Sequence, residues 1–223
     1  MKTNKNANRG FTLIEMLVVI AIIGLLASIL VPAVTKALES ANRTKMVNNA
    51  SQLYKALYTI VADGGGIYDG RTFDFPSHND TTGAFVPADT TRDYFAYLAT
   101  NGVLQVPWSF FAAKDVPAAP GIYDGTPGSL AAFTSNNNAW RAVSNLSTQD
   151  VGAPFLVSRN LTAPALNGGY DVNARVTELA GAPYRENGLV VLFVGGNAQP
   201  MLNQALLWRN LNPTRKDNVI LGP

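Results

Sequence analysis

A run of 20 residues without a charged side chain, Met16–Thr35, constrains this chain more than any other feature. A helix needs about 20 consecutive, predominantly apolar residues to span a bilayer. Residues 1–10 precede the run and contain three basic residues and no acidic one. Basic residues beside a membrane-spanning helix stay on the cytoplasmic side. We therefore expect the residues that follow the run to lie across a membrane from residues 1–10.

Three interpretations of this N-terminal segment compete. A secretory signal peptide has a shorter apolar stretch and a small-residue cleavage site, for which 37–41 is a loose candidate. A plain signal anchor keeps the whole segment. Neither explains Glu15 near the start of the apolar run, because a carboxylate costs about 2.5–3.5 kcal/mol at the bilayer centre on insertion scales.

The third interpretation comes from the order Arg-Gly-Phe-Thr-Leu-Ile-Glu at residues 9–15. This order resembles the type III signal of type IV pilins and type II secretion pseudopilins, and the resemblance covers residues 9 to about 35. It implies that a dedicated prepilin peptidase cuts between Gly10 and Phe11 on the cytoplasmic side, removes residues 1–10 as a leader, and methylates the new N-terminus at Phe11. Gly24 and Pro32 stand where many members carry a helix-loosening glycine and proline.

The resemblance also gives Glu15 a role in assembly. Cleavage creates a positive amine at Phe11, and two opposite buried charges are far less costly than one. Glu15 lies four residues on, about one helical turn, so it can pair with its own amine. Pairing with the amine of a neighbouring subunit would instead fix the axial register of a filament, and this is our hypothesis. The alternative is a carboxylate that only extends to the membrane interface.

The helical pattern continues beyond the apolar run. Residues 36–62 contain no glycine or proline. An apolar stripe recurs there at three- and four-residue steps, at Met46, Ala50, Leu53, Leu57 and Ile60. The glycines at 64–66 end the pattern. We predict one helix over 11–62, about 78 Å long at 1.5 Å per residue.

Two parts of that helix have different expected surroundings. Residues 11–35 would lie in lipid or in a filament core, and residues 36–62 would form an amphipathic stalk packed against the head. Pro32 lacks an amide hydrogen, so we expect a kink or local melting there. Gly24 weakens the helix upstream, and 24–32 is the stretch expected to unwind when subunits leave the membrane.

The remaining residues, 63–223, alternate turn residues with short apolar runs, which predicts an α+β head with an antiparallel sheet laid over the stalk. Together with the long helix this is the pilin fold that the resemblance implies. The expected elements are a helix over 91–99 capped by Thr90 or Thr91, strands over 155–158, 188–194 and 198–202, a hairpin turn at 195–197, and a short closing helix over 202–211.

The composition offers little for catalysis. The chain has no cysteine and one histidine, which excludes thiolate chemistry and the usual multi-histidine metal sites. No nucleophile elbow or P-loop is present, so we expect no enzymatic activity and no cofactor. Asp63, Asp69 and Asp74 flank glycines and are weak candidates for calcium ligands, since some major pseudopilins hold calcium in a loop. Aspartates before glycines are also common turn formers.

The formal net charge of +2 is unevenly distributed. The head has ten basic and thirteen acidic residues, and removal of the leader leaves the mature chain at −1. Nucleic-acid-binding domains concentrate lysine and arginine, so we expect no nucleic-acid partner.

The resemblance implies a structural subunit of a type II secretion pseudopilus or type IV pilus-like filament. Its implied partners are identical or related pilin subunits, the prepilin peptidase and methyltransferase, an inner-membrane assembly platform and membrane lipid. The precursor would lie in a bacterial inner membrane with its head outside the cytoplasm, and the mature form in a periplasmic or cell-surface filament. The alternative is a membrane-anchored or secreted extracytoplasmic binding protein or enzyme that uses residues 1–35 as a signal anchor or signal peptide.

Overall fold

The protein is described by a computed structural model that covers residues 11–62, 76–77, 86–146, 150–166, 169–211 and 219–223. The leader, the glycines at 64–66 and the three candidate calcium ligands lie outside these described residues. The chain divides into two compact units, residues 1–41 and residues 42–223. The first unit contains the apolar part of the long helix, and the second contains the rest of that helix together with the head.

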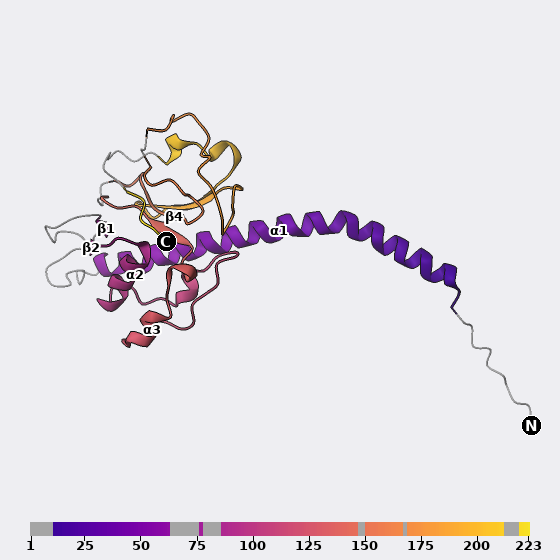
Figure 1. Ribbon diagram of the computed structural model, residues 1–223, viewed down its shortest axis with the longest axis horizontal. Coiled ribbons are helices and arrows are strands. Elements are labelled where there is room, and N and C mark those ends of the chain that lie inside the picture. Colours follow the sequence, from indigo (N-terminus) through magenta and orange to yellow (C-terminus); the bar gives the residue numbers. More distant parts are fainter. Residues whose placement is uncertain (1–10, 63–75, 78–85, 147–149, 167–168, 212–218) are drawn as a thin grey trace, which may run out of the picture. The chain divides into compact units, whose positions relative to one another are not determined.

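The long helix α1 spans Leu13–Ala62 and has 50 residues. Figure 1 shows it as one unbroken helix. The sequence predicted a start at Phe11, but Thr12 uses its side chain to cap the helix, so the first helical residue is Leu13. Pro32 lies inside the helix without interrupting it. The helix is therefore continuous at the position where the sequence predicts a kink or local melting.

The second part of α1 enters the core of the head. Met46, Ala50, Leu53 and Leu57 are each at most 1% exposed, which confirms the predicted stripe over these four positions. They belong to the same buried cluster as the side chains of the sheet. The side chain of Ile60, the fifth predicted member, lies outside the described residues.

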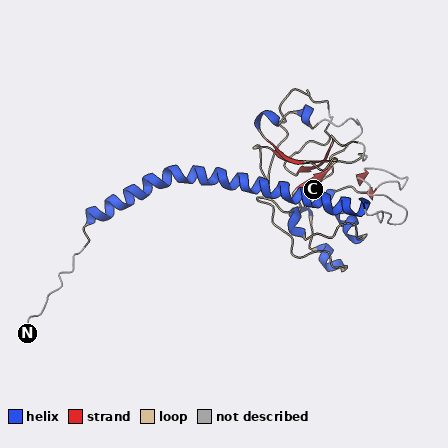
Figure 2. Ribbon diagram, turned by 180° about the vertical axis from the view of Figure 1, so that it is seen from behind, coloured by secondary structure: helices blue, strands red, loops and turns tan. Residues whose placement is uncertain are grey.

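A four-stranded antiparallel sheet packs with α1, so the predicted α+β class is confirmed (Figure 2). Its strands are β3 Trp140–Ala142, β4 Pro154–Ser158, β5 Leu189–Phe193 and β6 Ala198–Met201, in the order β3-β4-β5-β6. Every residue of β4 and β5 is buried, as expected for apolar strands covered on both faces. A separate parallel pair joins β1 Pro76–Ser77 to β2 Val86–Pro87.

The predicted strands at 155–158, 188–194 and 198–202 are confirmed, each with slightly different ends. The turn between β5 and β6 is a hairpin in which Gly196 adopts φ +83°. β3 was not predicted as a strand. It has three residues, which are too few to give a periodic pattern in the sequence. It forms a strand because all three pair with β4, with Trp140 opposite Ser158.

The helices of the head are short. α2 spans Thr91–Thr100, and the Thr90 side chain accepts a hydrogen bond from the Asp93 amide, so the predicted capped helix is confirmed. α3 spans Pro127–Ala131. Four 3-10 turns complete the set: η1 Trp108–Phe111, η2 Ser135–Asn137, η3 Asn203–Ala205 and η4 Trp208–Asn210. The predicted closing helix over 202–211 was wrong, because Leu206 (φ −83°, ψ 63°) and the extended Leu207 are not helical and separate η3 from η4.

Candidate functional site

The start of α1 is the first candidate site, and its geometry is set by Thr12 and Glu15. The Thr12 amide and the Thr12 hydroxyl both donate to Glu15 Oε2, at 2.8 Å each. The Glu15 amide donates in return to Thr12 Oγ1 at 3.3 Å. This is a capping box, in which the residue before the helix and the third helical residue satisfy each other's amides.

The capping box changes what the Glu15 carboxylate requires from its surroundings. Its oxygen already accepts two hydrogen bonds within its own chain, and a satisfied polar group costs less to bury than a bare one. Glu15 was predicted from the sequence as a functional residue, and Thr12 was not. The signal was available, since a threonine followed three residues later by a glutamate, ahead of an apolar run, is a capping-box pattern.

Phe11 lies directly before this box, with 74% of its surface exposed. The other predicted cleavage residue, Gly10, lies outside the described residues. The peptide bond proposed for cleavage therefore precedes the helix by two residues, and neither Phe11 nor Thr12 is helical. A peptidase binds extended chain more readily than helix, so this position suits processing.

The apolar part of α1 comes directly after the capping box, and its side chains are exposed. Large apolar side chains on every face of the helix are exposed, from Leu13 at 79% to Leu38 at 60%. By length and composition α1 can cross a membrane, and it is the one such helix among the described residues. A helix that is apolar all round is stable in lipid or in a protein core.

Polar groups within this apolar part are satisfied by the helix itself. The Ser28 hydroxyl donates to the Leu25 carbonyl at 2.7 Å, and the Thr35 hydroxyl donates to the Val31 carbonyl at 2.9 Å. Such bonds satisfy side chains where no water is present and slightly weaken the helix around them. The two hydroxyls lie on either side of Pro32 in the sequence. Three residues that weaken a helix, Gly24, Ser28 and Pro32, therefore lie within a stretch of nine residues.

One loop of the head, which contains Tyr184 and Asn187, contacts α1 where the helix enters the core. The Tyr184 hydroxyl donates to the Asn42 carbonyl at 3.4 Å and lies 3.3 Å from Met46 Sδ. Arg43 donates to the Asn187 carbonyl at 3.0 Å. Its guanidinium also lies 5.1 Å from the centre of the Tyr184 ring, within the range of a cation–π contact.

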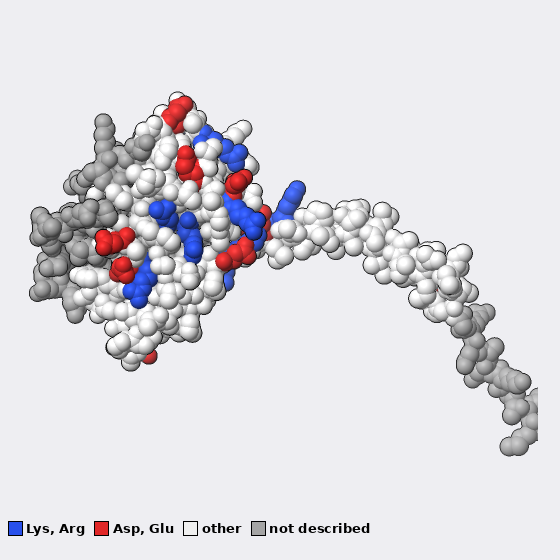
Figure 3. All heavy atoms as spheres, in the orientation of Figure 1, with Lys and Arg blue, Asp and Glu red and all other residues white. Residues whose placement is uncertain are grey.

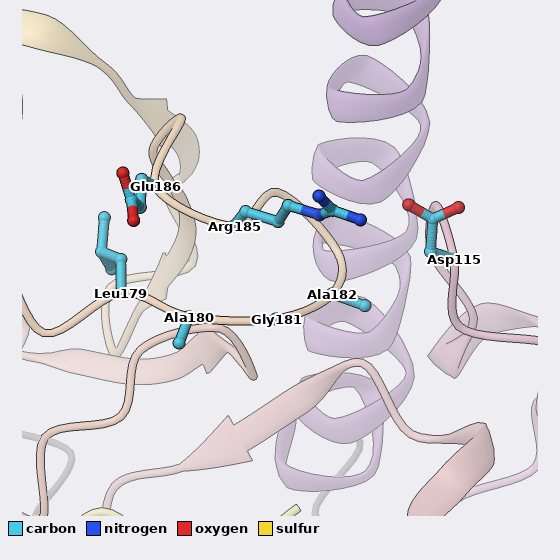
Figure 4. Close-up of a pocket in the computed structure, with 7 residues that line it drawn as sticks. All are labelled: Asp115, Leu179, Ala180, Gly181, Ala182, Arg185 and Glu186. Atoms are coloured by element: carbon cyan, nitrogen blue, oxygen red, sulfur yellow. The ribbon is translucent and has the colours of Figure 1, made fainter.

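An open pocket of about 510 Å³ is lined in part by this loop and is the second candidate site. Figure 4 shows the Arg185 guanidinium and the Asp115 carboxylate pointing toward one another from two different loops. Glu186 lies at the opposite end of the pocket beside Leu179. The lining offers no nucleophile paired with a base. Among the described residues no three histidine, cysteine, aspartate or glutamate side chains gather into a metal-binding group.

Charge on the head is mixed. On the face shown in Figure 3, acidic and basic side chains of the head are interspersed, and the apolar helix carries almost none. A nucleic-acid-binding surface would gather its basic residues instead. The face shown therefore presents no basic stripe for a phosphate backbone.

The comparisons with known proteins agree with the first candidate site. The family described as the prokaryotic N-terminal methylation motif matches residues 5–31. Type II secretion system core protein G of Escherichia coli is 32% identical over 120 residues, which cover 52% of this chain and 77% of that protein. The same core protein G from Klebsiella michiganensis is 43% identical over 53 residues, 24% of this chain and 37% of that protein.

Pilus proteins match over a shorter region. Type IV major fimbrial protein FimA of Dichelobacter nodosus is 37% identical over 60 residues, which cover 27% of this chain and 38% of that protein. The chain thus spans well under half the length of the fimbrial relatives. No solved structure matches the chain.

Proposed function

The chain belongs to the pseudopilin family of type II secretion system core protein G, and from this premise we propose that it is a structural subunit of a type II secretion pseudopilus or type IV pilus-like filament. The observation that carries the proposal is the beginning of α1. There a processing signal, a capped glutamate and an exposed apolar helix follow one another without interruption. Copies would polymerise through residues 11–35, which are exposed in the described part of the chain.

Processing is the first step that this function requires. Residues 1–10 act as the leader, the prepilin peptidase cuts between Gly10 and Phe11, and the same enzyme class methylates the Phe11 amine. Mass spectrometry of the mature protein purified from its bacterial membrane should find a methylated N-terminus at Phe11. A mature N-terminus at Met1, or one beyond Ala41, would falsify this processing and favour a signal anchor or a signal peptide.

Before cleavage the three basic residues of the leader keep residues 1–10 in the cytoplasm and place the head outside it. The precursor is thus held in the inner membrane by residues 11–35, in contact with lipid and with the assembly platform. The mature form moves into a periplasmic or cell-surface filament. The head carries no enzymatic activity in this proposal, and its part is to build the filament surface.

Glu15 directs assembly once the Phe11 amine is free. The capping box holds the carboxylate near the start of the helix, where the amine of an adjacent subunit can reach it, and pairing the two charges fixes the axial register. Self-pairing within one chain would satisfy the charges without linking subunits.

The test is expression of Glu15→Ala with the assembly machinery. Membrane insertion and cleavage should stay intact while filaments are abolished or greatly reduced, as judged by electron microscopy of sheared filaments. Glu39→Ala, which removes the next acidic residue of α1, is the matched control and should assemble. Normal filaments from Glu15→Ala would contradict the role of Glu15, and cleaved parent chain that forms no filament with its machinery present would contradict the subunit function itself.

A further inference from the structure

Two asparagine–glycine pairs lie in the described part of the head, and their surroundings differ. They are Asn101–Gly102 after α2 and Asn187–Gly188 before β5. Asparagine is a thermolabile residue. When glycine follows it, the glycine nitrogen can attack the side-chain amide carbon, because no side chain on the glycine obstructs the approach. The hydrogen bonds around each pair determine whether that reaction can proceed in the folded protein.

The Asn187–Gly188 pair is in position to react. Asn187 is exposed, and its side-chain amide makes no hydrogen bond to the described part of the chain. The Gly188 nitrogen donates no hydrogen bond to the described residues either. Residue 188 has φ +124°, and a Cβ there would lie 2.6 Å from the Met201 carbonyl oxygen. The fold therefore requires glycine directly after Asn187.

The Asn101–Gly102 pair is held by hydrogen bonds at both reacting groups. The Asn101 side-chain nitrogen donates to the Tyr97 carbonyl at 2.7 Å, which fixes the amide against α2. The Gly102 nitrogen donates to the Ala99 carbonyl at 3.1 Å. Both bonds must break before the nitrogen can reach the side-chain carbon, and broken hydrogen bonds cost free energy. The same dipeptide is thus protected at the end of α2.

Arg43 on α1 increases the reactivity of the second pair. Its guanidinium donates to the Asn187 main-chain carbonyl at 3.0 Å, and a hydrogen bond from a charged donor is stronger than one between neutral groups. It withdraws electron density from the peptide group that joins Asn187 to Gly188. The Gly188 N–H becomes more acidic as a result, and the nitrogen must lose this proton in order to attack.

We propose that Asn187 is a self-modification site, at which the chain converts asparagine into aspartate and isoaspartate without an enzyme. The Gly188 nitrogen forms a bond to Asn187 Cγ, and its proton leaves with the side-chain nitrogen as ammonia. Water then adds to one of the two carbonyls of the succinimide ring and breaks the bond from that carbonyl to nitrogen. Opening at Cγ gives aspartate, and opening at the main-chain carbonyl gives isoaspartate.

Isoaspartate changes the loop that contacts α1, because it adds one carbon to the main chain at residue 187. Buried Asn160 donates to the Arg185 carbonyl at 2.8 Å and to the Gly188 carbonyl at 2.9 Å, and so holds the chain on both sides of this residue. A longer main chain disturbs these bonds and the bond from Arg43. The conversion is therefore an ageing reaction that loosens the loop, and it does not rest on the filament role.

The test follows both pairs in one sample of the full chain. The protein is purified in detergent and incubated at neutral pH, and peptide mapping by mass spectrometry measures conversion at each asparagine over time. Labelling with isoaspartyl methyltransferase detects isoaspartate. We expect several-fold faster conversion at Asn187 than at Asn101 in the folded chain, and similar rates at both in urea. Equal rates in the folded chain, or conversion of Asn187 only in urea, would overturn the proposal.

Asn187→Gln is the matched control, because it keeps an exposed amide but closes a larger and slower-forming ring. This variant should gain no isoaspartate at residue 187. Circular dichroism should show a lower unfolding temperature for the aged parent than for the fresh parent, and no change on ageing of Asn187→Gln. An aged parent that contains isoaspartate at residue 187 and keeps its unfolding temperature would overturn the effect on the loop.

Arg43→Gln tests the contribution of the guanidinium, since it removes the positive charge that polarises the Asn187 carbonyl. We expect conversion of Asn187 to become several-fold slower, and Arg43→Lys, which keeps the charge, to restore part of the rate. Conversion at Asn101 serves as the internal reference and should be unchanged in both variants. Faster or unchanged conversion in Arg43→Gln would overturn the assisting role of Arg43.

Discussion

Glu15, at the start of α1, has one role in the structure of the helix and a second, proposed role in assembly. Glu15 is the acidic member of a capping box and also the proposed partner of a methylated amine. The box explains how a carboxylate is held at the edge of an apolar helix before a neighbour arrives. Thr12 is therefore part of the candidate site together with Glu15.

Gly196 in the β5–β6 turn meets the stalk. A Cβ at this position would lie 2.4 Å from Tyr54 Cε1, and its φ of +83° favours glycine. We expect Gly196→Ala to destabilise the head by about 1–3 kcal/mol, measured by urea unfolding. Gly125 has φ +89° with nothing within 4 Å, so Gly125→Ala isolates the backbone cost of about 1–2 kcal/mol.

A double variant separates the two causes. Tyr54→Ala with Gly196→Ala removes the ring that the new Cβ would strike. The destabilisation should then be smaller than the sum of the two single effects. If the changes in the free energy of unfolding are additive, the Tyr54 ring and the residue at position 196 do not interact.

The Asp124 carboxyl has a lowered pKa in the folded protein. Hydrogen bonds from the Ser129 and Thr126 side chains, and from the Thr126 amide, lower the pKa of Asp124 to about 2. Because the pKa is lower in the folded than in the unfolded state, the ionised carboxylate stabilises the fold above about pH 4, and this contribution is lost as pH falls through about 2. Asp124→Asn should lower Tm at pH 7, and its difference from the parent should shrink toward pH 2.

Nuclear magnetic resonance titration of the Asp124 carboxyl checks the cause. Thr126→Val removes the hydroxyl that donates to Asp124 Oδ1 at 2.7 Å and should move the pKa upward. An unchanged pKa in that variant would assign the low value to other groups.

At the scale of elements, α1 is a helix whose two parts meet different requirements. Its buried positions face the head with helical spacing, while its apolar part satisfies its hydroxyls internally and contains a glycine and a proline. The helix is continuous across 24–32 in this structure. Unwinding of that stretch on leaving the membrane therefore remains a proposal about the filament.

Gly24→Ala tests that proposal at the element where it applies. A Cβ at Gly24 meets nothing within 4 Å, and alanine favours helix over glycine by about 1 kcal/mol. We expect the stiffened helix to insert and be cleaved normally but to give fewer filaments, counted by electron microscopy. Gly24→Ala with Ala27→Gly returns a glycine to the stretch and should restore assembly. An unchanged filament yield, together with a continuous helix in a filament map, would contradict the unwinding.

At the scale of the whole molecule, the boundary between the two compact units falls inside α1, after Ala41. The buried stripe begins at Met46, so a chain of residues 42–223 retains every described core contact of α1. We expect this chain to be soluble and to unfold in one cooperative transition, followed by circular dichroism. A chain beginning at Tyr54 loses three of the four stripe residues and should not fold. Failure of residues 42–223 to fold would show that the head requires the apolar helix.

The sequence by itself determined what depends on local order. The charge-free run, the 9–15 signal, the stalk stripe and the cap at Thr90 are set by residues a few positions apart, because helix faces and caps are formed by near neighbours. The strands at 154–158, 189–193 and 198–201 could also be predicted from the sequence, since each is an apolar run or is joined to one by a hairpin turn. The ends of these strands, the start of α1 and the 202–211 helix were predicted wrongly, and β3 was not predicted.

Only the tertiary structure decided what depends on distant pairing. β3 is a strand because β4 lies beside it, and the Arg141 side chain donates to the carbonyls of Ile220 and Leu221, up to 80 residues away in the sequence. Hydrogen bonds of this kind join main-chain groups that every residue possesses, so they leave no pattern of side chains to recognise. The processing signal was legible from the order of residues. The contacts between Arg141 and residues 220–221 depend on the folded sheet, which brings distant parts of the chain together.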